Sequence, residues 1–168
     1  MPIRIPTVAR RFFFVVAAWA IVAGVPQAAA AQIGGPLEPA LSVERLADLS
    51  FGTVLTGDWV LVAPADPTAA QFSITAPRNA TVFISLELPA NLQGGLSTLP
   101  VTFGAADGEW SAQDRPVGRT AFDPRQGTQI VVPNTGRVFV WIGGGASIPP
   151  TQPSGAYRGA ITMTVVVN

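Results

Sequence analysis

Three carboxylates stand close together in the stretch ADGEWSAQDRP, and no other group of side chains is better placed to do chemistry. Asp107, Glu109 and Asp114 could supply oxygen ligands to a calcium ion, or the acid and base of a glycosidase. A calcium loop of the known kind needs oxygen ligands at its first, third and fifth positions, and the fifth position counted from Asp107 is only Ser111. Glycosidase carboxylates must face each other across a cleft, which spacing within one loop does not establish. We interpret the stretch as a polar hairpin loop, and we keep Asp107, Glu109, Trp110 and Asp114 as a possible ligand loop.

The composition excludes most catalytic chemistry. The chain contains no histidine, no cysteine and no lysine. Histidine is the commonest general base and transition-metal ligand, while cysteine supplies thiol nucleophiles and structural zinc sites. We therefore predict that the protein is not an enzyme and has no catalytic residue, metal or cofactor. Without cysteine there is no disulfide framework, so a hydrophobic core must hold the fold together.

Tryptophan residues suggest a different class of function, the binding of carbohydrate. Trp59 and Trp141 lie inside strand-like patterns, so we predict that both belong to the core. Trp110 lies in the polar loop and is the ring that we expect to be free to stack on a ligand. The alternative function that these residues support is a monomeric exported carbohydrate-binding module.

Residues 1–31 have the features of a secretory signal peptide. Arg4, Arg10 and Arg11 precede an apolar stretch over 12–25, and small alanines follow up to Ala31. The apolar stretch is shorter than the roughly 20 residues that a membrane-spanning helix needs. We predict cleavage after Ala31, export to the periplasm, the cell surface or the extracellular space, and no membrane span in the mature protein. These residues leave open whether the arginine pair is read as a twin-arginine signal.

The mature chain has 137 residues, which suits one domain. Its seven arginines and ten carboxylates give a net charge of −3, and no basic residues cluster. Nucleic acid is excluded as a partner, because binding it needs concentrated positive charge.

Alternating apolar residues predict strands almost throughout residues 41–168. Val82 and Ile84 share a face in ATVFISLEL, as do Met163, Val165 and Val167 in TMTVVV. Gly, Pro and Asn residues that favour turns separate these runs at short intervals. The pattern predicts an all-β protein of about seven to nine strands, a sandwich or a barrel, and of the two we expect an antiparallel β-sandwich.

Three segments need separate comment. RVFVWIG, residues 137–143, is apolar on both faces, which predicts a strand in the middle of the sandwich or against a partner. Residues 42–49 fit either a short helix or an edge strand with a bend. Residues 143–155 are rich in Gly, Pro and Ser, and we expect a long loop there.

The segment that precedes the first strand, residues 32–40, also has an alternating pattern. Ile33, Leu37, Leu41 and Val43 fall on alternate positions, so an extended chain would present one mostly apolar edge. Two prolines in this leader lack the N–H group that a ladder requires, which favours a disordered leader instead. Both interpretations stay open.

The segments LSFGTVLTG, FVWIGGGASI and GAYRGAITMTVVVN resemble the bacterial exported family known as domain of unknown function 4402, and more distantly the subunits of chaperone–usher fimbriae. The resemblance covers residues 41–168, although this chain lacks the disulfide of typical fimbrial subunits. It implies an immunoglobulin-like sandwich with an incomplete sheet, which the N-terminal strand of a neighbouring subunit completes by β-strand addition. It also implies other copies, related subunits and a periplasmic chaperone as partners. The residues that could take part in strand exchange are Ile33, Leu37, Leu41, Val43, Ile161, Met163, Val165 and Val167.

The sequence therefore predicts a signal peptide over residues 1–31, an extended leader over 32–40 and a β-sandwich domain over 41–168. The function that we expect is that of a non-catalytic secreted protein, a cell-surface or fimbria-like structural subunit.

Overall fold

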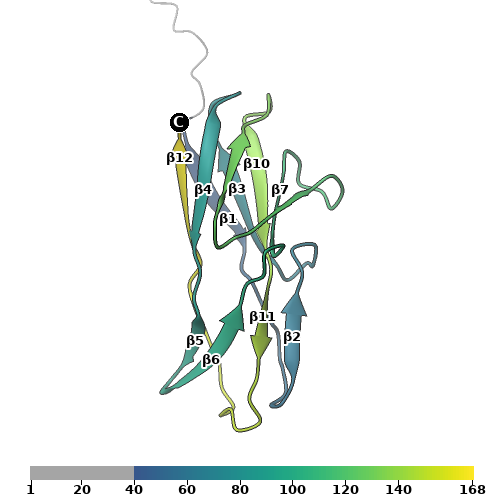
Figure 1. Cartoon of the computed structure of the whole chain (residues 1–168), viewed down its shortest axis with the longest axis vertical. Helices are drawn as coiled ribbons and strands as arrows, with labels where there is room; N and C mark the ends of the chain where they lie inside the picture. Colours follow the sequence, from purple (N-terminus) through teal and green to yellow (C-terminus); the bar gives the residue numbers. More distant parts are fainter. Residues whose placement is uncertain (1–39) are drawn as a thin grey trace, which may run out of the picture. The chain divides into compact units, whose positions relative to one another are not determined.

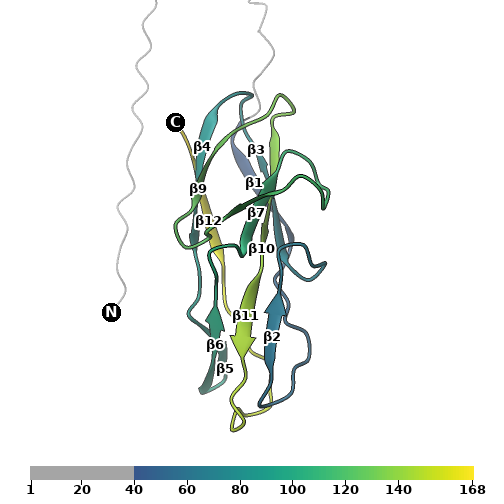
Figure 2. The same cartoon turned by 45° about the vertical axis from the view of Figure 1, so that its right-hand side comes forward.

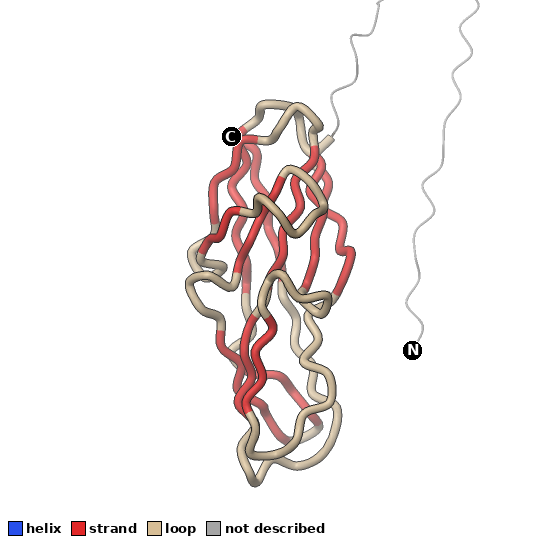
Figure 3. The backbone as a smooth tube through the Cα atoms, turned by 90° about the vertical axis from the view of Figure 1, so that its right-hand side faces the viewer, coloured by secondary structure: helices blue, strands red, loops and turns tan. Residues whose placement is uncertain are grey.

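A computed structural model describes residues 40–168, which form strands, turns and loops without any helix (Figure 3). The predicted signal peptide and the leader up to residue 39, with Ile33 and Leu37, lie outside the described residues. The strands of residues 40–168 number twelve, against the seven to nine expected. They are β1 (Ser42–Ala47), β2 (Trp59–Val62), β3 (Ala70–Thr75), β4 (Thr81–Glu87), β5 (Asn91–Gly94), β6 (Ser97–Thr102), β7 (Gly108–Ser111), β8 (Thr120–Phe122), β9 (Thr128–Val131), β10 (Arg137–Ile142), β11 (Gly144–Ser147) and β12 (Thr162–Val167).

The strands form three sheets, and every pairing within them is antiparallel. The first sheet has the order β1-β3-β10-β7-β8, the second β2-β11-β6-β5 and the third β12-β4-β9. Figures 1 and 2 show β12 and β4 beside β3, β10 and β7 in the upper part of the described chain, with β2, β5, β6 and β11 below them. The prediction of an all-β, antiparallel, sandwich-like protein is confirmed.

The main core lies between the five-stranded and the three-stranded sheet. Alternate residues of β4 and β10 supply fully buried β-branched side chains, as the period of two predicts. The cluster consists of Ala70, Phe72, Ile74, Ala76, Val82, Ile84, Phe122, Ile130, Val132, Val138, Val140 and Ile142. A smaller cluster of Leu99, Val101, Ala146 and Ile148 lies under the four-stranded sheet. The strand β10, predicted to lie in the middle of the sandwich or against a partner, lies between β3 and β7 in the five-stranded sheet.

The segment that could have been helix or bent strand is the edge strand β1. It pairs with β3, and the register shifts between Arg45 and Ala47. The shift supplies the bend, because a bulge adds a residue to one strand and turns the chain.

Two expectations were wrong. The start of the Gly-rich segment 143–155 is the strand β11 rather than a loop, because its glycines serve packing. A Cβ on Gly144 would lie 2.9 Å from Cε1 of Phe103. Trp59, expected in the core, has 62% of its surface exposed, since β2 turns Val60 and Val62 inward and Trp59 outward. β2 is apolar on both faces, so its sequence alone does not reveal which of its two alternate sets of residues faces the core.

Candidate functional site

The strongest candidate site is the free edge of β12. Within residues 40–168, β12 pairs with β4 alone and β1 pairs with β3 alone. Each of these strands therefore carries a row of backbone N–H and C=O groups on its other side without a ladder partner in the described chain. Such a row is a template for pairing with a further strand.

The residues predicted for strand exchange on β12 share its inner face. Met163, Val165 and Val167 stand opposite Leu86, Ile84 and Val82. Since Ile84 and Val82 are fully buried, this face of β12 points into the core. Met163, Val165 and the preceding Ile161 are nevertheless only half-buried, and Val167 is 38% exposed.

The inner face of β1 is uncovered in the same way. Val43 stands opposite Ile74, which is fully buried, so Val43 points toward the core. Even so, Val43 is 41% exposed and Leu41, just before the strand, is 39% exposed. Core-facing aliphatic side chains with this much exposure indicate that a covering element is missing from the described residues.

The strands β1 and β12 run in opposite directions. A short turn over residues 76–80 joins β3 to β4, so the end of β3 and the start of β4 lie together (Figure 1). Ser42 pairs with Thr75, and Val167 pairs with Val82. The start of β1 and the end of β12 therefore meet at this one end of the sandwich.

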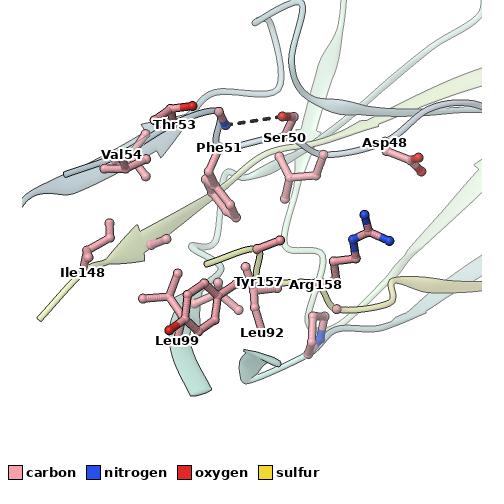
Figure 4. A pocket seen from close by; sticks show the side chains of 18 of the residues that line it. Asp48, Ser50, Phe51, Thr53, Val54, Leu92, Leu99, Ile148, Tyr157 and Arg158 are labelled. Atoms are coloured by element: carbon pink, nitrogen blue, oxygen red, sulfur yellow. Dashed lines mark hydrogen bonds between the residues drawn. The ribbon is translucent and has the colours of Figure 1, made fainter. Parts of the chain in front are cut away.

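At the other end of these two strands lies a pocket of about 960 Å³. Residues 45 and 47–56 line one wall and residues 152–161 line another, so the end of β1 and the approach to β12 both reach it. Phe51 points into the pocket from the first wall toward Tyr157 and Leu99 (Figure 4). These two walls contain most of LSFGTVLTG and the first half of GAYRGAITMTVVVN, so two motifs a hundred residues apart meet at one pocket.

Tyr157 anchors the segment that precedes β12, residues 152–161. Its hydroxyl donates a hydrogen bond to the carbonyl oxygen of Pro153 at 2.7 Å. Its ring lies so close to Gly94 that a Cβ there would be 2.6 Å from Cδ1 and Cε1. The next residue, Arg158, exchanges two backbone hydrogen bonds with Gln93 on β5, at 2.7 and 2.9 Å.

The interpretation of the possible ligand residues as a polar hairpin loop was wrong, because Gly108–Ser111 is the strand β7, which pairs with β10 and β8. The three carboxylates of this stretch accept hydrogen bonds from three separate groups of the chain. Asp107 Oδ2 accepts one from the backbone N–H of Gly104 at 2.6 Å, and Asp114 Oδ1 accepts one from Gln71 Nε2 at 2.7 Å. Glu109 pairs with Arg119 at 3.3 Å. Trp110 is half-buried and packs against the main core rather than standing free. Among residues 40–168, no three His, Cys, Asp or Glu side chains gather as a metal site.

Arg119 organises this region, and no sequence signal pointed to it. Its guanidinium carbon lies 3.6 Å from the ring centroid of Trp141, and its side chain is only 9% exposed. Nη1 donates to the carbonyl oxygen of Pro64 at 2.9 Å and Nε to that of Arg115 at 3.0 Å. Trp141 is thus buried as predicted, but on the outer face of its sheet under this arginine.

A local ion pair occupies the turn after β8. Hydrogen bonds from the Arg125 side chain and backbone N–H lower the pKa of Asp123 from its ordinary 3.8 to about 2. The same pair raises the pKa of Arg125. Neither residue lines the pocket.

Comparison with known proteins identifies the family. Residues 50–167 match the family model described as "Domain of unknown function (DUF4402)". The chain belongs to the DUF4402 family. The DUF4402 match includes most of both pocket walls and β12, and it excludes the leader and β1. No curated protein matches the chain. Residues 40–168 contain no helix that is long and apolar enough to span a membrane.

Proposed function

We propose that this DUF4402 protein is a non-catalytic exported structural subunit, whose free β12 edge accepts an extended segment from another copy by β-strand addition. One observation carries the proposal: within residues 40–168, β12 has a free edge, and its core-facing residues are incompletely covered.

The strand order supports an immunoglobulin-like sandwich that lacks its last strand. In such a sandwich, strands A, B, E and D form one sheet and C, F and G the other. The letters A to F can be given, in chain order, to the strands β1, β3, β4, β7, β10 and β12. This assignment reproduces the observed neighbours β1-β3-β10-β7 and β12-β4. The position of G, beside β12, is vacant within residues 40–168. The hydrogen bond from Tyr157 to Pro153 resembles the tyrosine corner that precedes strand F in these folds.

The leader, residues 32–40, is the segment that suits this edge. Its apolar residues Ile33 and Leu37 alternate and would continue the inner face that Val43 and Val165 begin. No charged residue other than Glu38 occurs in it, so it can lie against an apolar groove at little desolvation cost.

Strand direction favours a leader from another copy. The leader joins β1 at its start, where β12 ends, and β1 is about 20 Å long at 3.3 Å per residue. If a chain's own leader folded back beside β1, it would run parallel to β12. To run antiparallel to β12, the chain's own leader would have to end beside the far end of β1. The one or two residues that would then connect it back to the start of β1 span only about 7 Å, which is less than the length of β1. Antiparallel ladders are the slightly more stable kind, and a second copy can supply one without this constraint.

The expected gain is sufficient for a stable contact. Full burial of a valine side chain contributes about 1.5–3 kcal/mol, so covering the exposed two-fifths of Val43 and of Val167 contributes about 1 kcal/mol each. A strand paired along the six residues of β12 forms about six ladder hydrogen bonds, each with a net contribution of about 1 kcal/mol. Apolar leader side chains seated in the groove add to this. A periplasmic chaperone that covers the same edge before assembly fits the proposal, because the free edge would otherwise aggregate.

Deletion of residues 32–40 tests the proposal. The mature protein and the truncated protein are purified, with and without a co-expressed chaperone and usher, and their masses are measured by light scattering. We expect oligomers of the mature protein and monomers of the truncated one. A matched control exchanges Ile33 with Gly34 and leaves Leu37 in place, which keeps the composition and puts the two apolar residues on opposite faces of the strand, and it is expected to behave like the truncation. If the mature protein is a monomer under every condition, the proposal is wrong.

A further inference from the structure

The outward face of the four-stranded sheet has a second unusual feature, an exposed indole on a free edge. Trp59 and Leu61 alternate along β2 and are 62% and 51% exposed. Within residues 40–168, β2 pairs with β11 alone, so both side chains stand at the margin of the sheet. A tryptophan is costly to leave in water, and such rings are concentrated at binding surfaces.

Next to this indole, β11 presents no side chain, because it carries glycine where the ring comes close. Leu61 stands opposite Gly145, and Gly145 stands opposite Thr102 on β6. A Cβ on Gly145 would lie 3.6 Å from Cζ2 of Trp59 and 3.1 Å from Oγ1 of Thr102. The ring therefore reaches over a residue without a side chain, and Gly145 is buried beneath its neighbours.

Apart from Pro100, the rest of this face is polar and uncharged. None of the four strands β2, β5, β6 and β11 contains a charged residue. The register places a row of exposed hydroxyl and amide side chains on the same face as Trp59, and these are Ser147, Thr102, Thr98, Asn91 and Gln93. Hydroxyl and amide groups both donate and accept hydrogen bonds.

We propose that this face binds a neutral oligosaccharide, with one sugar ring stacked on Trp59 and its hydroxyl groups hydrogen-bonded by Ser147 and Thr102. A sugar ring has an apolar C–H face and a rim of hydroxyl groups, which matches a flat indole bordered by uncharged donors and acceptors. Anionic sugars have no cation on these strands to pair with. The exposed large apolar side chains of β2 are Trp59 and Leu61 alone, too few for the roughly 1,000 Å² that a specific protein interface buries. The proposal does not depend on strand addition, because β2 and β12 belong to different sheets.

Titration of the mature protein with defined oligosaccharides tests this site. The probes are cellohexaose, xylohexaose and mannohexaose, with hexagalacturonate as the anionic counterpart, followed by tryptophan fluorescence and calorimetry. We expect at least one neutral hexasaccharide to bind and to change the tryptophan emission, while hexagalacturonate does not bind. Trp59→Ala is expected to weaken binding by about tenfold or more, as for a central aromatic contact, and Trp59→Tyr to retain most of the affinity.

Controls distinguish oligosaccharide binding at Trp59 from loss of folding and from a protein interface on this face. Val117→Ala removes a side chain that is 73% exposed but absent from this face, and it is expected to bind as the unchanged protein does. Circular dichroism and urea unfolding verify that each variant is folded. The proposal is overturned if no neutral hexasaccharide binds, if binding is indifferent to Trp59→Ala, or if sedimentation shows self-association that Trp59→Ala abolishes, which would make the face a protein interface.

Discussion

Gly94→Ala is expected to displace Tyr157 and loosen the wall of the pocket next to β12. The backbone of Gly94 does not require positive φ, so alanine is permitted there and only the ring obstructs it. The new Cβ would lie 2.6 Å from two ring carbons of Tyr157, and the surrounding chain would have to shift. Overpacking of this kind costs about 1–3 kcal/mol. Loss of the hydrogen bond from Tyr157 to Pro153 costs about 1 kcal/mol more.

The alanine also restricts the unfolded chain, which returns about 0.4–1 kcal/mol. The net expectation is a loss of about 2 kcal/mol in the free energy of unfolding. Urea denaturation followed by tryptophan fluorescence measures it, and the midpoint should fall by about 1 M for a slope near 2 kcal/mol per molar. Gly155→Ala is the matched control, because no heavy atom lies within 4 Å of its Cβ, and it should leave the stability unchanged or raise it by up to about 1 kcal/mol.

A double-variant cycle isolates the contact. In a Tyr157→Ala background the ring is gone, so Gly94→Ala should cost nothing, and the coupling between the two positions should be about 2 kcal/mol. A loss below 0.5 kcal/mol for Gly94→Ala alone, or an equal loss in both backgrounds, would refute the idea that Gly94 is there to admit the ring.

Two further predictions concern single charged residues. Arg119→Met should lower the free energy of unfolding by about 3 kcal/mol, because a nearly buried cation–π contact and two hydrogen bonds to carbonyl groups are lost. Arg119→Lys, which keeps the charge and loses the planar fork, should lose a smaller part, and equal stability of all three proteins in urea would contradict this. At Asp123 the folded pKa of about 2 lies below the ordinary 3.8, so its pairing with Arg125 stabilises the fold above about pH 4 and is lost as the pH falls toward 2. Carboxyl-carbon NMR titration should show this pKa, Arg125→Gln should raise it toward 3.8, and an unchanged value in the variant would show that Arg125 is not the cause.

The sequence predicted which residues face the core wherever one face of a strand is buried and the other is exposed to solvent. The alternation in β4 and β12 placed Val82, Ile84, Met163 and Val165 on their observed faces, because period two follows directly from strand geometry. β2 is apolar on both faces and has no such alternation, so Trp59 was assigned to the wrong face. β11 was missed because Gly144 and Gly145, which admit neighbouring strands closely, have the composition of a loop.

The free edges of β1 and β12 within residues 40–168 could be anticipated only through resemblance. Which strands end a sheet depends on pairings between residues far apart in the chain, such as Ser42 with Thr75 and Val167 with Val82. The role of Arg119 could not be predicted from the sequence, because its partners Trp141 and Pro64 are distant in the chain and contact it only after folding. The carboxylates of the polar loop were easy to find, yet their partners, Gly104, Gln71 and Arg119, came to light only with the structure.

The most direct test of strand addition uses cysteine pairs, which are unambiguous because the chain has no cysteine of its own. One set of variants carries cysteine on the outward positions of the leader, Gly34, Pro36 or Glu38, and another carries it at Thr162, Thr164 or Val166 on the outward face of β12. The two sets are mixed, oxidised and separated without reductant. We predict crosslinks between different copies in which the leader number falls by two as the β12 number rises by two, the signature of an antiparallel strand. Numbers that rise together, or no crosslinks in any mixture, would contradict the account.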